Sequence, residues 1–329
     1  MKLERISQLY IHRDNITLCI RCTDEQKDFL KKHLNSFFTF NDCEEHGESW
    51  TLDITTHEII QDKLIKHVHQ GEKLFLIDDR QRYIYMVKPY DLVWRKQYAL
   101  RFIRDFFRNE FVRLGYIFFH GGVISKKNIG LAFLGEKKSG KTTTIINGLK
   151  QSFNFITNDD VSVQIKDMKV LGYGWPRSIS IRKDTLINIP QLMTSLKVSN
   201  PDNFTASGEN FIFLYPNELA SVMDIKIIPC TEIKYFIFPK FNSSLSSSKL
   251  TKLSYHESTK LLELNHDSDV HKYYREFEDF FNLNLTTEKN FKEISETLIS
   301  QAEFYLLEQN MNTMESSQLI LNSLVEVRK

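Results

Sequence analysis

The chain has 329 residues, which is enough for two domains or for one large core with a smaller module. Its formal net charge is +1, with 26% charged and 41% hydrophobic residues, a composition typical of ordinary globular proteins. The charge balance excludes the basic excess of a nucleic-acid-binding protein and the acidic block of a disordered tail. We therefore expect no nucleic-acid partner.

The N-terminal segment and the apolar runs indicate where the protein acts. The segment "MKLERISQLY" contains Glu4 and lacks an apolar core of signal-peptide length. No apolar run approaches the roughly 18 residues that a membrane-spanning helix needs. We expect a cytoplasmic protein without a membrane partner.

Residues 1–90 have the pattern of a small α+β module. Apolar alternation predicts strands at 15–22 and 49–55, and an amphipathic helix is predicted at 24–38. A polar turn within 73–88 separates two further apolar runs, which predicts a hairpin. The module contains no catalytic constellation, and we expect it to help recognise an acceptor.

The cysteines of this module outline a Cys3His zinc site through Cys19, Cys22, Cys43 and His46. The alternation around the first two cysteines predicts a strand, however. Residues three apart on a strand face opposite ways, so both sulfurs could not easily reach one metal ion. Buried or half-buried thiols are therefore the favoured interpretation.

A second domain is predicted at 91–329, beginning with one long helix at 92–114 that ends near Gly115. Hairpins are predicted around turns at 126–128 and 166–168, and a strongly buried strand at 232–241. The tail from Asp267 onward is predicted to be largely helical.

The stretch "FLGEKKSGKTTTI", residues 133–145, matches the phosphate-loop pattern G-x-x-x-x-G-K-[ST] at every fixed position. Such a loop follows a strand, opens a helix and points backbone N–H groups at phosphate oxygens. Lys141 would pair with the β- and γ-phosphates, and the Thr142 hydroxyl would ligate Mg²⁺. The alternative is a lysine-rich loop without a ligand. The predicted nucleotide-binding residues are Gly135, Lys138, Ser139, Gly140, Lys141, Thr142 and Thr143.

Two adjacent carboxylates, Asp159 and Asp160, follow the next predicted strand, which starts one helix after the loop. Ligands of open α/β sheets bind at that end of the strands. Phosphoryl transfer needs a metal ligand and often a carboxylate that accepts the proton of the attacking hydroxyl. We expect both residues to be catalytic and Asp160 to hold Mg²⁺ with Thr142, although Asn-Asp-Asp is also common in solvated turns.

Three further polar residues are candidates for the same site. His120 ends a predicted strand beside two glycines, where it could bond to an aspartate and tune its pKa. Arg177 and Arg182 follow later, and an arginine near the phosphates would stabilise charge in the transition state. Each of the three could instead be an ordinary polar side chain. We include His120, Lys141 and Arg182 with the two aspartates as catalytic candidates.

Taken in order, these motifs resemble the HPr kinase/phosphorylase family over residues 92–326. That family has a His-Gly strand, a phosphate loop, one helix and a strand ending in Asp-Asp. The matching positions here are His120-Gly121, Gly135 to Thr142, and Asp159-Asp160. The resemblance implies an α/β kinase domain, with a mixed sheet flanked by helices, after the small N-terminal α+β module. It also implies that one aspartate is the base, one a metal ligand, and that His120 supports the base.

The departures from that family concern the acceptor. The family's loop is richer in glycine and serine and carries an acidic residue after its Lys-Ser pair, whereas Thr143 follows Thr142 here. The arginine signature of the phosphorylase activity is missing. These differences suggest a relative with another acceptor, like those found beside genes for ribosomally made, modified peptides.

The sequence therefore predicts transfer of a phosphoryl group from ATP, or GTP, with Mg²⁺, to a serine or threonine of a small protein or precursor peptide. Two alternatives stay open. One is a kinase for an amino acid or a nucleoside. The other is a nucleotide-binding partner protein without catalysis. The sequence leaves open whether the chain forms a homo-oligomer.

Overall fold

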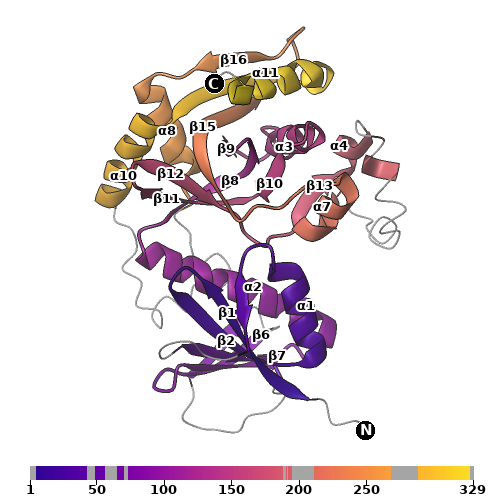
Figure 1. Cartoon of the computed structure of the whole chain (residues 1–329), viewed down its shortest axis with the longest axis vertical. Coiled ribbons are helices and arrows are strands. Elements are labelled where there is room, and N and C mark those ends of the chain that lie inside the picture. The colour runs from indigo at the N-terminus through magenta and orange to yellow at the C-terminus, as the bar shows by residue number, and fades with distance from the viewer. Residues whose placement is uncertain are drawn as a thin grey trace. The chain divides into compact units, whose positions relative to one another are not determined.

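The structure is a computed structural model that describes residues 5–42, 49–55, 65–69, 73–187, 190, 192–194, 211–267 and 288–326. The chain forms two compact units. The first contains Met1–Leu114, and the second contains Gly115–Ser268 and Thr286–Lys329. Each unit has its own large sheet (Figure 1).

The first unit is built on a seven-stranded mixed sheet in the order β3-β1-β2-β4-β7-β6-β5. The strands expected at 15–22 and 49–55 and the hairpin within 73–88 are all present. An additional strand, β1, pairs antiparallel with β2 along its whole length. The strands are β1 (Ile6–Arg13), β2 (Ile16–Thr23), β3 (Thr39–Asn41), β4 (Trp50–Asp53), β5 (Ile65–His69), β6 (Lys73–Asp78) and β7 (Tyr83–Lys88).

Two helices complete this unit, and side chains define where each begins. α1 (Asp24–Leu34) starts with a capping box, in which Thr23 and Gln26 bond to each other's backbone N–H. α2 (Leu92–Arg113) starts after Asp91, whose carboxylate accepts a hydrogen bond from the N–H of Trp94 at 2.9 Å. The long helix expected at 92–114 is thus confirmed.

α2 belongs to the first unit, although the sequence placed it at the start of the second. Its Arg95 is fully buried and donates hydrogen bonds to the carbonyl oxygens of Ile54, Met86, Val87 and Pro89. Burial lowers the pKa of Arg95 to about 10. Because these carbonyls belong to segments of the first unit, the guanidinium fixes the helix there, and the division falls after the helix.

Cys19 and Cys22 are buried free thiols on β2, as the alternation predicted. Burial raises the pKa of Cys22 to about 12, so its thiol stays protonated at neutral pH. Cys43 and His46 lie outside the described residues, and so the zinc site outlined by these four residues is not tested.

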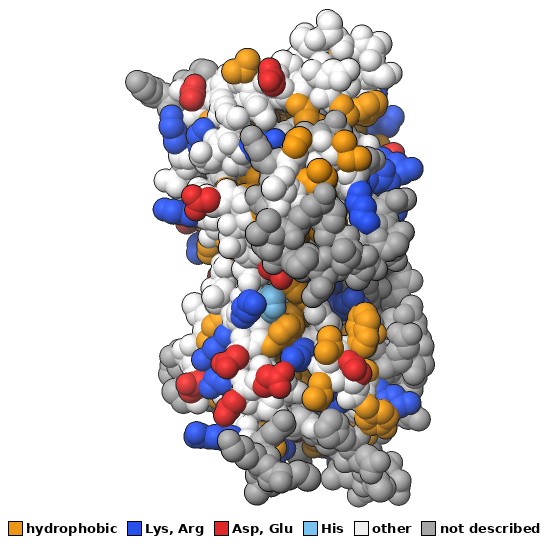
Figure 2. All heavy atoms as spheres, turned by 90° about the vertical axis from the view of Figure 1, so that its right-hand side faces the viewer, with side chains coloured by type: hydrophobic (Ala, Val, Ile, Leu, Met, Phe, Trp, Pro, Cys, Tyr) orange, Lys and Arg blue, Asp and Glu red, His pale blue; other side chains and the backbone are white. Residues whose placement is uncertain are grey.

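Charges of both signs are mixed on the surface of the first unit. Figure 2 shows acidic and basic side chains interspersed over the lower half of the molecule, with hydrophobic side chains between them. The ion pairs of this unit include Lys27 with Asp42 and Lys96 with Glu25, both at 2.7 Å. Exposed pairs of this kind add little stability, about 0–1 kcal/mol each.

The second unit has an eight-stranded mixed sheet and a separate two-stranded sheet. The large sheet contains β8 (Ile117–Lys126), β9 (Ile129–Leu134), β10 (Asn154–Thr157), β11 (Asp160–Lys166), β12 (Lys169–Tyr173), β15 (Cys230–Phe241), β16 (Lys249–Lys252) and β17 (Glu303–Gln309). The small sheet pairs β13 (Ile179–Arg182) with β14 (Phe211–Leu214). The helices are α3 (Lys141–Lys150), α4 (Lys183–Ile187), α7 (Pro216–Met223), α8 (Tyr255–Asn265), α10 (Glu288–Gln301), the short η2 (Met311–Thr313) and α11 (Met314–Glu326).

The strand pairings of the large sheet form a closed circuit, β8–β11–β12–β15–β9–β8. The hairpins β8–β9 and β11–β12 are those expected from the turns at 126–128 and 166–168. β9 and β10 are both antiparallel to β8 and hence parallel to each other, with β8 between them. The loop and α3 therefore connect two parallel strands, as the sequence predicted.

Helices cover both faces of this sheet (Figure 1). On one face, Ile124 of β8 and Phe133 of β9 pack with side chains of α3 and α11 in one hydrophobic core. On the other face, Phe119 and Val161 pack with side chains of α8 and α10. The expectation of a mixed sheet flanked by helices is confirmed.

The expectation for the tail needs a correction, because residues 303–309 form the strand β17 between two helices. β17 pairs parallel with β15 and antiparallel with β16, so it lies inside the sheet. Its apolar run is short and follows directly on a helix, and such runs do not distinguish strand from helix. Across the described part of the chain, no helix is both long and apolar enough to span a membrane.

Candidate functional site: the loop before α3 and its carboxylates

The loop between β9 and α3 has positive φ angles at three positions, two of which are glycines. The angles are 156° at Gly135, 74° at Lys138 and 102° at Gly140, in the region that glycine adopts most readily. Gly140 is the N-cap of α3, so no side chain caps this helix. The first N–H groups of α3 and the positive end of its dipole can therefore bind an anion.

Lys141 begins α3 and is buried, with 7% of its surface exposed. Its Nζ donates hydrogen bonds to the carbonyl oxygens of Gly135 at 2.6 Å and Glu136 at 2.9 Å. Burial lowers the pKa of Lys141, while the negative charges of Asp159 and Glu136 act in the opposite direction. The predicted phosphate-binding lysine thus lies within electrostatic range of the first predicted aspartate.

The other loop residues differ in exposure. Lys138 is exposed at the tip of the loop, and Thr142 and Thr143 are half-buried on the first turn of α3. The Ser139 hydroxyl oxygen is buried and has no hydrogen-bond partner among the residues that the structure describes. Several hydroxyl groups therefore line the start of the helix.

Gln309, at the end of β17, connects through hydrogen bonds to the end of the loop and the first turn of α3. Its Nε2 donates to the Thr144 hydroxyl, which in turn donates to the Gly140 carbonyl at 2.9 Å. Its Oε1 accepts a hydrogen bond from the Ser317 hydroxyl at 2.9 Å. Sequence reasoning missed this residue because the tail was interpreted as helical. The sequence gives no clear signal for the strand, because its apolar run "FYLL" is too short to show a period.

The two aspartates lie at an interruption of one long strand. β10 and β11 run end to end along β8, with Thr157 opposite Val123 and Asp160 opposite His120. Both pairs have the same register along β8, so β10 and β11 would form one strand if residues 158 and 159 were also paired. The Thr157 hydroxyl donates a hydrogen bond to the Asp160 carbonyl at 2.7 Å, which joins the two ends of this interruption.

Gly122 makes room for this interruption. A Cβ added to Gly122 would lie 2.8 Å from Asn158 Cα, 2.7 Å from the Thr157 carbonyl oxygen and 2.4 Å from Ile145 Cδ1. Backbone atoms cannot yield at such distances, so only glycine fits here. The second glycine of "HGG" thus has a structural reason that the sequence alone did not reveal.

His120 and Asp160 are directly opposite each other on neighbouring strands, so their side chains lie on the same face of the sheet. This face also carries Ile124, which packs against α3. The register therefore brings His120 beside the second aspartate on the face where the loop's helix lies. Their proximity was expected from the order of the motifs.

Arg177 links the two aspartates. Its Nη1 lies 2.8 Å from Asp160 Oδ1, and its Nε lies 3.8 Å from Asp159 Oδ2. Asp160 is buried, with 1% of its side chain exposed, whereas Asp159 is 24% exposed. The indole N–H of the fully buried Trp175 donates to the Ser162 hydroxyl at 2.9 Å and fixes the turn before Arg177.

Arg182 occupies another place. It lies on β13, and its guanidinium stands over the Phe211 ring of β14, 5.4 Å from the ring centroid. The ion pairs with the aspartates come from Arg177. The structure thus brings Lys141, Asp159, Asp160, His120 and Arg177 together around the loop, and Arg182 lies on the small sheet.

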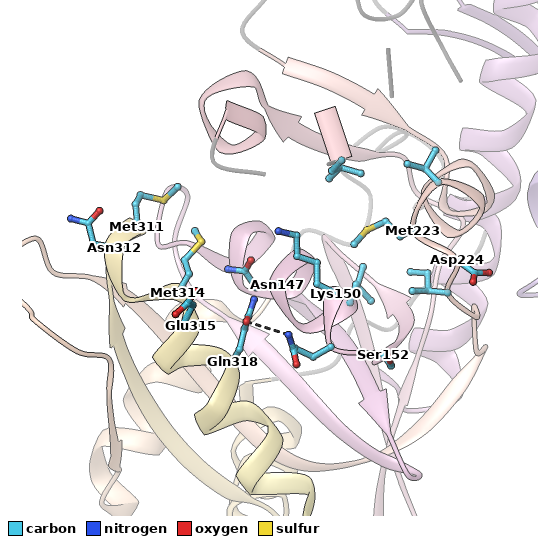
Figure 3. A pocket seen from close by; sticks show the side chains of 15 residues that line it. Asn147, Lys150, Ser152, Met223, Asp224, Met311, Asn312, Met314, Glu315 and Gln318 are labelled. Carbon is cyan, nitrogen blue, oxygen red and sulfur yellow. Dashed lines mark hydrogen bonds between the residues drawn. The ribbon is translucent and has the colours of Figure 1, made fainter. Parts of the chain in front are cut away.

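A cavity of about 860 Å³ lies beside the second half of α3, away from the loop. Met223 of α7, Lys150 of α3 and Met314 of α11 are among its lining residues (Figure 3). The loop residues 135–140 and the two aspartates are not part of its lining. The cavity is therefore distinct from the candidate site.

Comparisons with known proteins add little to this geometry. No protein-family model matches the sequence, and no curated protein matches it either. Among solved structures, the Hpr(Ser) kinase/phosphatase from Coxiella burnetii aligns with 63% of this chain and 93% of its own, at 9% sequence identity and a TM-score of 0.31. A likeness this weak carries no argument, so any function must be argued from the site itself.

Proposed function

We propose that this protein transfers the γ-phosphoryl group of ATP or GTP to a serine or threonine hydroxyl of a small protein or precursor peptide. One observation carries the proposal. The buried amine of Lys141 stands at the uncapped start of α3 and is influenced by the charge of Asp159. Phosphoryl transfer requires a group that binds phosphate, here the start of α3 with Lys141, and a carboxylate close to it.

The residues of this site fit a bound triphosphate. The helix start offers N–H groups, and the first turn of α3 contains no acidic side chain that would repel phosphate. The Ser139 hydroxyl, buried without a partner among the described residues, is a hydrogen-bonding group suited to a phosphate oxygen. Lys141 supplies a positive charge. Its amine now bonds to loop carbonyls, and a charged phosphate would replace them because it attracts the ammonium group more strongly.

The metal ion would depend on the nucleotide. The described His, Cys, Asp and Glu side chains form no group of three or more that could hold a metal ion. Mg²⁺ usually binds through one or two carboxylates together with substrate phosphates. Thr142 and an aspartate would hold Mg²⁺. When bound, this ion would neutralise part of the phosphate charge.

The accessibility of the aspartates suggests how they divide the work. Asp159 is partly exposed, so an acceptor hydroxyl can approach it, and it would accept the proton of that hydroxyl. Asp160 is buried and paired with Arg177, and it would be the aspartate that holds Mg²⁺ with Thr142. His120, opposite Asp160, would contribute to the same polar cluster.

The acceptor class rests on the loop sequence and its departures from the HPr kinase pattern. A transfer assay with γ-labelled ATP and Mg²⁺ tests it, using serine-containing peptides, amino acids and nucleosides as acceptors. We expect labelled peptide. Labelled metabolites alone would favour a small-molecule kinase, and nucleotide binding without any product would favour a non-catalytic partner.

The mechanism is tested in the same assay with Lys141→Ala and Asp159→Asn. Both should abolish transfer, a loss of at least about 10²-fold for the general base alone, while circular dichroism shows a folded protein. Lys150→Ala, at the opposite end of α3, is the matched control and should transfer at the wild-type rate. Undiminished transfer by the first two variants would refute the mechanism.

A further inference from the structure

The carboxamide of Asn158 stands out among the buried polar groups of this unit. The residue is 4% exposed, and its Oδ1 and Nδ2 are both without a hydrogen-bond partner among the described residues. A carboxamide can make four hydrogen bonds, two as donor and two as acceptor. Leaving all of them unmade costs stability, and buried polar groups in proteins are normally paired.

The position of Asn158 points to the nucleotide site. It precedes Asp159 in the interruption between β10 and β11, and its Cα lies beside Gly122 on the face that carries α3. Ile145 of α3 reaches the same spot. Because Ile145 lies four residues after Lys141, both are on one side of the helix, and it is this side of α3 that Asn158 lies beside.

A second buried group without a described partner lies in the loop before α3. The Ser139 hydroxyl belongs to the loop itself, whereas Asn158 belongs to the strand interruption. Lys141 is bonded to the loop and lies within electrostatic range of Asp159, the neighbour of Asn158. One ligand bound at this lysine would satisfy both buried groups.

We propose that Asn158 binds the nucleotide directly, donating a hydrogen bond from its amide to a terminal phosphate oxygen. This inference rests on the proposed function. A neutral amide suits the position because Asp159 and Asp160 already carry negative charge, and a third carboxylate would repel the phosphates. The amide thereby adds binding without adding to the negative charge of the site.

The test compares Asn158→Leu with Asn265→Leu. Asn265 is also buried, with 6% exposed, but its Nδ2 donates to the Leu261 carbonyl at 2.7 Å. Each variant is measured twice: thermal unfolding without nucleotide, and calorimetric affinity for ATP with Mg²⁺. If Asn158 serves the ligand, Asn158→Leu keeps or raises the unfolding temperature, because an unpaired buried group is replaced by an apolar one.

The affinity of Asn158→Leu for ATP should fall about tenfold or more, the usual effect of losing a hydrogen bond to a charged group. Asn158→Asp should bind more weakly still. Asn265→Leu should unfold at a lower temperature and bind as the wild type does. Unchanged affinity in Asn158→Leu would overturn this inference alone, and so would a loss that comes with a lower unfolding temperature. A wild type that binds no ATP would refute the proposed function as well.

Discussion

At the scale of single residues, Arg177 determines how the two aspartates can be used. It places a positive charge 2.8 Å from a carboxylate that is 1% exposed, and 3.8 Å from one that remains accessible. A buried carboxylate needs such a partner, because an uncompensated buried charge is strongly destabilising. Arg177 therefore compensates the buried carboxylate of Asp160, and Asp159 stays accessible.

Removing this partner should lower stability. We expect Arg177→Ala to reduce the free energy of unfolding by about 3 kcal/mol, because Asp160 loses its nearest counter-charge. The control is Lys252→Ala, which breaks an exposed pair with Glu303 in the same unit and should cost less than about 1 kcal/mol. Urea denaturation measures both. Equal effects would show that the pair with Asp160 does not matter for stability.

The sequence predicted the loop, His120 and both aspartates because motif spacing fixes their order on strands and helices. It named Arg182 among the catalytic candidates, whereas the ion pairs with the aspartates come from Arg177. The choice depends on Trp175, whose burial and bond to Ser162 turn the chain so that Arg177 meets the carboxylates. The role proposed for Asn158 could not be predicted either, because an asparagine in Asn-Asp-Asp has the pattern of a turn residue until its burial is known.

At the scale of elements, the site depends on where strands end. β9, β15 and β17 are parallel, so their C-terminal ends meet at one edge of the sheet, where the loop begins. The sequence predicted the first two of these strands. It missed β17, because an apolar run of four residues, "FYLL", has no periodicity that excludes a helix. The contact between Gln309 and the loop was missed with it.

Gln309 should stabilise the loop through its two side-chain hydrogen bonds. Gln309→Leu would remove the bonds to Thr144 and Ser317 and lower the free energy of unfolding by about 1–3 kcal/mol. It should also speed amide hydrogen exchange in the first turn of α3. Gln164→Leu, which loses one half-buried bond from Tyr173, is the control and should leave that exchange unchanged. Identical exchange in the two variants would contradict an anchoring role.

At the scale of the whole molecule, the chain separates into two units, and every residue assigned to the site belongs to the second. The sequence predicted two parts and placed their boundary before α2. Helical periodicity shows that a helix exists and cannot show which core it joins. Arg95 decides that here, through bonds to carbonyls of the first unit. The first unit is left for other roles, and recognition of the acceptor remains our expectation for it.

The central claim is that the loop and the aspartates form one Mg²⁺–nucleotide site. Calorimetric titration of ATP, with Mg²⁺ and with a chelator in its place, tests it most directly on the wild type, Asp160→Asn and Lys150→Ala. We expect Mg²⁺ to tighten ATP binding to the wild type and to Lys150→Ala, and Asp160→Asn to lose most of that gain. No ATP binding by the wild type, or the same gain in Asp160→Asn, would contradict the claim.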